Sequence, residues 1–288
     1  MMHIVERHPV ENAGFLADNA PRLAASFERN LSLVTQLPKK LTTLMDTALL
    51  ELGSRCALDP QATEQGTWDS LARASQASCA IFESATTASE TSDCLINGEF
   101  YPIPRIGPTH FSTPNNWLTA LWLAMITRDF ARLRMLAAVD ESIFQPSRSD
   151  YDTYIYSWIN TLQAYFSDQA EQVAPNFEAT SRLLAPEHTE KSSATKLRLT
   201  TGPQLLLFLE LASANEDGFN EALGESLESH REFWSPDASE QRSPVGYIAL
   251  APLAMACVAH DSGMNVQVES DYLPVNLLTG YWTNAFQF

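Results

Sequence analysis

Histidine is the residue type in this chain best suited to bind a metal or move a proton, and its spacing favours neither role. The six histidines are His3, His8, His110, His188, His230 and His260. No two of them stand three or four residues apart, so no helix presents a zinc-binding histidine pair on one face. Glycine-rich phosphate loops and the Gly-x-Ser-x-Gly nucleophile motif are also absent. The sequence therefore predicts a protein that is not an enzyme and uses no metal or cofactor.

Two polar pairs come closest to catalytic groups. Asp150 and Asp152 are neighbouring carboxylates, but their place before an apolar helical pattern is more typical of a helix N-terminus than of an acid–base pair. His260 and Asp261 end a predicted helix. There, a histidine near the negative end of the helix dipole and a loop acid are the more usual interpretation.

Acidic residues are concentrated in one third of the chain. Residues 140–240 hold 18 acids and 6 bases, which is 12 of the 17 excess negative charges. On a helix predicted over 219–234, four glutamates repeat at spacings of four, three and four, so they share one face. We call this set the acidic stripe; it consists of Glu221, Glu225, Glu228 and Glu232.

The acidic stripe has two open interpretations. Like charges at this spacing destabilise a helix by roughly a few tenths of a kcal/mol per pair. The stripe is either a solvated face of an acidic protein or a docking surface whose repulsion a basic partner relieves. We take it as a candidate partner-binding site. Its carboxylates should also favour the protonated form of His230, which lies between Glu228 and Glu232.

A second candidate surface is rich in aromatic residues over 149–158. Tyrosine and tryptophan are favoured in recognition surfaces because they supply large contact area with few rotatable bonds. The period predicts that Tyr154, Ile155 and Trp158 form the buried face of a helix, whereas Tyr151 is exposed. Asp150, Tyr151 and Asp152 are therefore the candidate partner-binding residues here.

Composition narrows the class of protein further. With a net charge of −17, the surface should repel nucleic-acid phosphates and anionic lipid, so direct nucleic-acid or membrane binding is excluded and a basic protein is favoured as partner. Four scattered cysteines form no framework and predict buried, reduced thiols. The N-terminus lacks the apolar segment of a secretory signal. We expect a cytoplasmic protein.

Apolar periodicity predicts an all-α fold: a single multi-helical domain of packed antiparallel helices over 1–288, with at most one or two short strands, near 95–101 and 266–268. The prolines of 95–114 favour an extended connector between a helical lobe 1–94 and a second lobe 115–288. The two most apolar helices should bury Trp122 and Leu253. Helices are predicted over 10–36, with Pro21 starting a new turn or kinking the run, over 39–56, with Gly53 as a C′ residue, and over 117–126, capped by Asn115 and Asn116. Further helices are predicted over 68–85, 128–139, 150–172, 176–185, 193–214, 217–234, 245–262 and 272–279.

The C-terminal run resembles a known family. An apolar helix containing Leu250-Ala-Pro-Leu-Ala is followed by Asp261-Ser-Gly and then by Val268-Glu-Ser-Asp-Tyr-Leu-Pro. This string is similar to the immunity protein 49 family of bacterial polymorphic toxin systems, and the likeness extends over roughly 115–280. The resemblance implies a non-enzymatic antidote that binds a cognate toxin domain. It carries no catalytic residues, and it assigns Glu269, Asp271 and Tyr272 a structural role beside the apolar helix.

Two other functions stay open from the residues alone. An acidic helical adaptor would use the same surface for a host protein. A small-molecule sensor or unrecognised hydrolase would show an enclosed pocket lined by His110 or His260 with converging carboxylates. The oligomeric state is not predicted.

Overall fold

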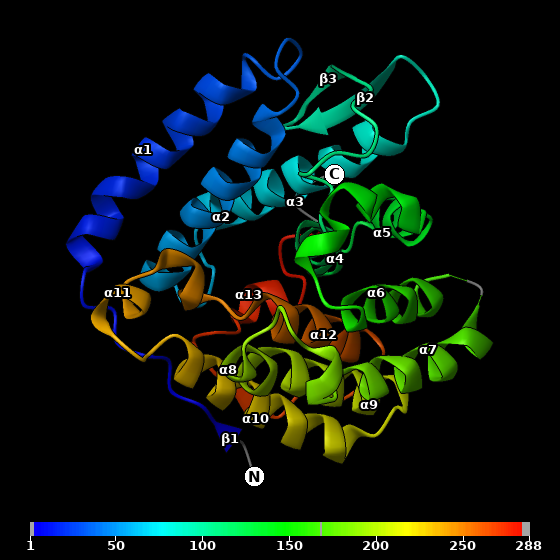
Figure 1. The fold of residues 1–288 in the computed structure, drawn as a ribbon. Helices are drawn as coiled ribbons and strands as arrows, with labels where there is room; N and C mark the ends of the chain where they lie inside the picture. Colours follow the sequence, from blue (N-terminus) through cyan, green and yellow to red (C-terminus); the bar gives the residue numbers. More distant parts are fainter. Residues whose placement is uncertain (1–2, 168, 284–288) are drawn as a thin grey trace.

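Three long helices form the N-terminal part of the fold. The structure is a computed structural model that describes residues 3–167 and 169–283. Its first helices lie side by side as one layer (Figure 1): α1 (Ala13–Leu31), α2 (Lys40–Leu58) and α3 (Gln65–Thr86). Leu41, Leu44 and Leu52 of α2 are fully buried because α2 packs against both neighbours. The predicted helices 10–36, 39–56 and 68–85 are confirmed.

One local prediction in this layer is wrong. Gly53 does not end its helix; α2 runs five residues further, and Gly53 lies where the chain at Pro244 crosses closely. α1 continues through Pro21 as one helix, with the proline ring exposed. Because proline has no N–H, the carbonyl oxygen four residues before it loses its helical hydrogen bond. On this exposed side of the helix, water can donate to that oxygen instead.

The proline-rich stretch is more than a connector. Strands β2 (Thr91–Ile96) and β3 (Glu99–Pro104) form an antiparallel hairpin that packs on α3. Asn97 and Gly98 turn it with positive φ angles of 53° and 80°, as a two-residue hairpin loop requires. Cys94, Ile96 and Ile103 are fully buried, so the hairpin contributes to the core.

Two apolar helices cross the centre of the molecule. In α4 (Pro114–Thr127) and α12 (Leu250–Asp261) most residues are buried, and the two helices pack against each other. Trp122 and Leu253 are buried as predicted. The first turn of α4 is capped by Thr113, whose side chain accepts a hydrogen bond from the Asn116 N–H, rather than by Asn115 and Asn116. Pro114 at the first helical position needs no hydrogen-bond acceptor there.

One stretch, Pro244–Asp261, is long and apolar enough by composition to span a membrane, but 67% of it is buried inside the fold. Its helix, α12, covers only the last 12 residues; a 3₁₀ turn and an extended residue precede it. α12 is one of the two central helices of this domain.

Of the helices in the middle region, α5 (Phe130–Ala137) packs beside α4, whereas α9 (Gly202–Ala212) and α10 (Glu216–Phe233) lie below α12 in Figure 1. The aromatic face of α6, with Tyr154, Ile155 and Trp158, is buried as predicted. The elements of this region are α5 (Phe130–Ala137), η1 (Glu141–Asp150), α6 (Tyr154–Tyr165), α7 (Ala170–Leu183), η2 (Pro186–His188), α8 (Ala194–Lys196), η3 (Leu197–Thr201), α9 (Gly202–Ala212) and α10 (Glu216–Phe233).

The C-terminal segment packs against the first residues of the chain. Its elements are α11 (Ala238–Gln241), η4 (Pro244–Tyr247), α12, β4 (Val268–Glu269) and α13 (Val275–Leu278). β4 pairs in parallel with β1 (His3–Ile4), and Arg7 donates to the carbonyls of Cys56 and Ala57 at the end of α2. Buried residues from Val5 to Leu278 share one large core.

The all-α fold class and the single packed domain are confirmed. The strand content differs in detail: the described residues contain four short strands in two sheets, rather than one or two strands. Strand β1 could not be predicted from periodicity, because two residues are too few to show an alternation of apolar and polar side chains.

Candidate functional site

The acidic stripe lies on α10, as predicted. Asn215 caps this helix by accepting from the Gly218 N–H at 3.3 Å. Phe219, Leu223 and Leu227 are fully buried on the opposite face. The apolar period of α10 thus turns the glutamates outward.

The four glutamates of the stripe differ in their partners. Glu232 receives a hydrogen bond from Arg198 at 2.7 Å, and Glu228 pairs with Arg231. Glu221 and Glu225 are exposed and form no ion pair with any residue that the structure describes. The N-terminal half of the stripe therefore carries the uncompensated charge, and the C-terminal half is partly neutralised within the chain.

The prediction for His230 is wrong, because its ring turns inward rather than toward the stripe. Its Nε2 lies 2.9 Å from the Gly246 carbonyl oxygen, to which it donates, and the ring packs edge-on against Tyr272 at 4.7 Å between centroids. Burial lowers the pKa of His230 to about 4, although the bond to Gly246 opposes the shift. Burial also lowers the pKa of His8, whose Nδ1 lies 2.6 Å from the Tyr272 hydroxyl. Both rings are neutral at pH 7.

These buried imidazoles should make the protein less stable in mild acid. Above pH 6.5 neither the folded nor the unfolded chain protonates His230, so it contributes nothing to the pH dependence. Between pH 6.5 and pH 4 only the unfolded chain binds the proton, so the free energy of unfolding falls as pH falls, by at most about 3 kcal/mol from His230. Urea unfolding from pH 7.5 to 4.5 measures this slope. His230→Gln should flatten it, and equal slopes for the two proteins would contradict the assignment.

The three residues of the second candidate surface differ in their exposure to solvent. Asp150 is exposed, and Tyr151 is partly buried against the core rather than exposed. Asp152 is buried, and its carboxylate accepts from the N–H groups of Lys191 and Ser192 at 2.8 and 2.7 Å. Although burial opposes it, these hydrogen bonds hold the pKa of Asp152 below its ordinary value. Asp152 anchors a loop, so its carboxylate is not available to a partner.

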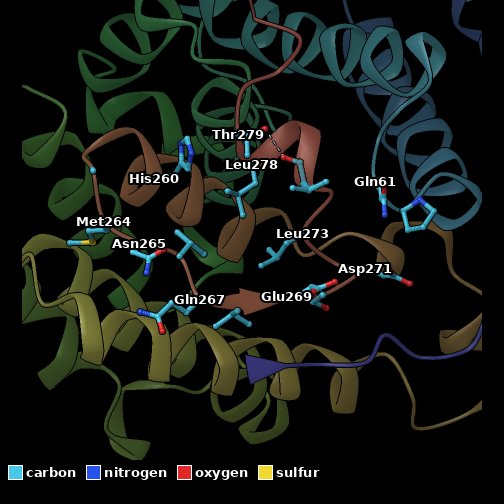
Figure 2. Close-up of a pocket in the computed structure, with 16 residues that line it drawn as sticks. Gln61, His260, Met264, Asn265, Gln267, Glu269, Asp271, Leu273, Leu278 and Thr279 are labelled. Carbon is cyan, nitrogen blue, oxygen red and sulfur yellow. Dashed lines mark hydrogen bonds between the residues drawn. The ribbon is translucent and has the colours of Figure 1, made fainter. Parts of the chain in front are cut away.

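An open pocket lies between the turn after α2 and the C-terminal segment (Figure 2). Its volume is about 660 Å³. Buried Val268, Leu273 and Leu278 form its apolar floor, and most of the polar lining is exposed. The lining residues are Pro60, Gln61, His260, Gly263, Met264, Asn265, Val266, Gln267, Val268, Glu269, Ser270, Asp271, Leu273, Val275, Leu278 and Thr279.

Hydrogen bonds fix one wall of this pocket to α10. The side chain of Asn220 donates to the Asn265 carbonyl at 2.9 Å and accepts from the Gln267 N–H at 2.6 Å. Glu216 accepts from the Asn265 N–H at 3.0 Å. These contacts hold an irregular segment in one conformation.

The other wall is fixed to the turn after α2 and to α4. The Asn276 N–H donates to the Gln61 carbonyl at 3.2 Å. Arg128, at the end of α4, donates to the carbonyls of Leu277 and Leu278 and to Asp261. Hydrogen bonds within the chain therefore fix both walls.

His260 and Asp261 do not assemble a catalytic dyad. The Asp261 carboxylate is occupied by Arg128 at 2.9 Å, so its contact with His260 Nδ1 belongs to an ion-paired helix end. Figure 2 places His260 at one end of the pocket, away from Glu269 and Asp271. The pocket is open rather than enclosed, and its carboxylates do not converge on the histidine.

The described residues contain no reactive thiol and no cluster arranged to bind a metal ion. All four cysteines are buried and unpaired, and burial raises the pKa of Cys56 and of Cys257 to about 12. A thiol with such a pKa is protonated and unreactive at pH 7. No group of three His, Cys, Asp or Glu in residues 3–167 and 169–283 is arranged to hold a metal ion.

The structural role expected for the 269–272 segment holds for Tyr272. Its carbonyl accepts from the Ala249 N–H at 3.2 Å, which joins the segment to the start of α12. Its hydroxyl accepts from the His8 main-chain N–H at 3.1 Å and forms a second hydrogen bond with His8 Nδ1 at 2.6 Å. Asp271 lies 3.9 Å from Arg7. Sequence reasoning missed Arg7 and His8, since the contact spans more than 260 residues and carries no local signal.

Fold and surfaces together define an acidic helical protein whose candidate functional features are one charged helix face and one open pocket. The family model for Immunity protein 49 matches residues 59–277, about three quarters of the chain. The chain therefore belongs to the Immunity protein 49 family and is an immunity protein. The match begins at residue 59 and includes α3 and the hairpin. The family likeness therefore extends further toward the N-terminus than the range of roughly 115–280 predicted from the sequence. No curated protein and no solved structure matches the chain.

Proposed function

We propose that this protein neutralises a cognate toxin domain by binding it one to one, without catalysing a reaction, in the cytoplasm of the cell that makes it. The observation that carries this proposal is membership of an immunity protein family over residues 59–277. Such a family implies a protein toxin as partner. A further support is that burial raises the pKa of all four cysteines, so none of these thiols is a ready nucleophile.

Charge supports a basic partner, such as a toxin that acts on nucleic acid. The chain carries −17, and Glu221 and Glu225 stand exposed without an internal ion pair. Opposite charge on a partner speeds association and excludes partners of the wrong sign. The acidic stripe therefore steers the toxin toward this protein, and the exposed Asp150 at the end of η1 adds to the negative charge. Nucleic acid and membranes are not partners in this proposal.

Titration against the toxin domain encoded beside this gene tests the proposal. Toxin activity should fall linearly as the immunity protein is added and reach zero at a fixed molar ratio. Glu221→Lys/Glu225→Lys should reach the same endpoint, yet associate about tenfold more slowly at low salt, because steering is lost while the contacts that hold the complex remain.

A substoichiometric endpoint would contradict the binding mechanism. If a trace of this protein reversed the damage with turnover, and if His110→Gln or His260→Gln abolished that turnover, the protein would be an enzyme. An association rate that is the same for both proteins at every ionic strength would remove the steering role from the stripe.

A further inference from the structure

We infer that the open pocket of Figure 2 binds an extended segment of the toxin that carries lysine or arginine, and that this contact holds the complex together after the acidic stripe has steered it. This inference rests on the proposed function for the identity of the partner. The chemistry of the occupant follows from the pocket itself.

Charge gives the first argument. Among the lining residues, Glu269 and Asp271 are carboxylates, and none is lysine or arginine. Glu269 is exposed and forms no ion pair within the described part of the chain; Asp271 has only a long contact of 3.9 Å with Arg7. A cation entering this end of the pocket would find negative charge that the chain leaves largely uncompensated.

The floor gives the second argument. Val268, Leu273 and Leu278 are buried beneath the opening, and Val275 stands beside them with 47% of its surface exposed. Lysine and arginine pack their methylene chains on apolar surface and keep the charged end at a polar rim. An apolar floor with carboxylates at one end matches this division, whereas a purely polar cation would leave the floor uncovered.

The edge of β4 gives the third argument. β1 and β4 are joined by the N–H of His3 donating to the Gln267 carbonyl and the N–H of Val5 donating to the Glu269 carbonyl. In a parallel pair, the main-chain groups of the residue between those two point to the opposite edge. That residue is Val268, which lines the pocket. Figure 2 shows β1 on one side of β4 and Leu273 and Leu278 on the other. An extended segment could therefore add its own main chain at this edge.

The pocket is also formed in advance. Asn220 fixes residues 265–267, the Gln61 carbonyl receives the Asn276 N–H, and Arg128 fixes the end of α13. A preformed site pays little ordering cost when a segment enters it, which favours slow dissociation.

The test uses the full-length protein with two probes. The first is a short, fluorescently labelled peptide that alternates valine and arginine, with a citrulline counterpart of the same shape but no charge. The second is the toxin domain itself. Glu269→Lys reverses the charge at the rim, and Gln61→Trp fills the opening without changing charge. Asp18→Lys is the matched control, since Asp18 is an exposed carboxylate on α1 and lies outside the pocket.

At physiological ionic strength we expect the arginine peptide to bind and the citrulline peptide to bind at least tenfold more weakly. Glu269→Lys and Gln61→Trp should each weaken the arginine peptide about tenfold, and Asp18→Lys less than twofold. With the toxin, the two pocket variants should dissociate about tenfold faster and keep the association rate of the control. Unchanged melting temperatures establish that every variant is folded.

Two outcomes overturn the inference, and they are distinct from failure of the proposed function. Equal peptide binding by all four proteins would show attraction to net charge alone. Tighter binding of the citrulline peptide would identify an apolar rather than a basic occupant. If the wild-type protein does not inhibit the toxin, the proposed function fails, and the peptide measurements still decide whether the pocket recognises a basic segment.

Discussion

Replacing Glu51 with alanine should lower the free energy of unfolding by about 3–5 kcal/mol, one of the two largest effects expected of any single substitution here. The Glu51 carboxylate is fully buried in α2 and accepts hydrogen bonds from Arg55 at 2.8 Å and from Arg73 of α3 at 2.8 and 2.9 Å. Its removal leaves two mostly buried guanidinium groups without their shared counter-ion. Among the described residues the Nε of Arg73 finds no hydrogen-bond partner, so this guanidinium depends on Glu51 for its hydrogen bonds.

Urea unfolding of Glu51→Ala measures this loss, with Glu232→Ala as the matched control. Glu232 also pairs with an arginine, Arg198, but both side chains are more than half exposed, so solvent screens the pair and its loss should cost far less than the loss of Glu51. Similar losses for the two variants would show that burial does not strengthen the Glu51 cluster. Glu51→Gln should fall between wild type and Glu51→Ala, because the amide oxygen still accepts from one arginine.

Replacing Gly53 with alanine should destabilise the protein by about 3 kcal/mol, near the upper end of the usual cost of overpacking. A Cβ atom at this position would lie 2.1 Å from the Pro244 carbonyl oxygen and 2.5 Å from its carbonyl carbon. Both are main-chain atoms, so no side-chain rotation can relieve the overlap. The η4 turn must move away from α2, and the start of α12 must move with it.

Gly14→Ala is the control for helix propensity. Gly14 is also inside a helix, α1, and a Cβ there would meet no atom within 4 Å. Alanine in that position should be neutral or stabilise by up to about 1 kcal/mol, because it lowers the entropy of the unfolded chain. Gly53→Ala should therefore lower the melting temperature, whereas Gly14→Ala should leave it unchanged or raise it. A stabilising Gly53→Ala would mean that η4 does not rest on α2.

Most helices could be predicted from the sequence because each buries one face. The spacing of Phe219, Leu223 and Leu227 is enough to locate α10 and to turn the acidic stripe toward solvent. The nearly continuous apolar runs of α4 and α12 identified the central pair and the burial of Trp122 and Leu253. The predicted helix boundaries were wrong where two local sequence signals compete. The Asn115–Asn116 pair resembles a cap, yet Thr113 followed by proline is the start that the chain uses.

The candidate sites were less predictable, because side chains on one helix face need not share one environment. Their spacing placed Glu221, Glu225, Glu228 and Glu232 on one helix face. It did not predict that Arg198 pairs with Glu232 and Arg231 with Glu228, which leaves the other two glutamates without an ion pair among the described residues. Neighbouring glutamates suggested a charged His230, whereas the ring is desolvated against Tyr272 and Gly246. Asp152 looked like a surface acid and is buried by a loop some 40 residues away.

By itself the sequence determined the fold class, the acidic stripe and the family, because each depends on residues that are close along the chain or on composition. Periodicity, charge content and the Val268–Pro274 string are local properties of the chain. Tertiary structure alone decided the pocket, the Arg7–His8–Tyr272 contacts and the Glu51 cluster. These depend on segments as far apart as His8 and Tyr272 being brought together by burial of a common core, and which of many equally apolar faces meet is set by packing over the whole chain.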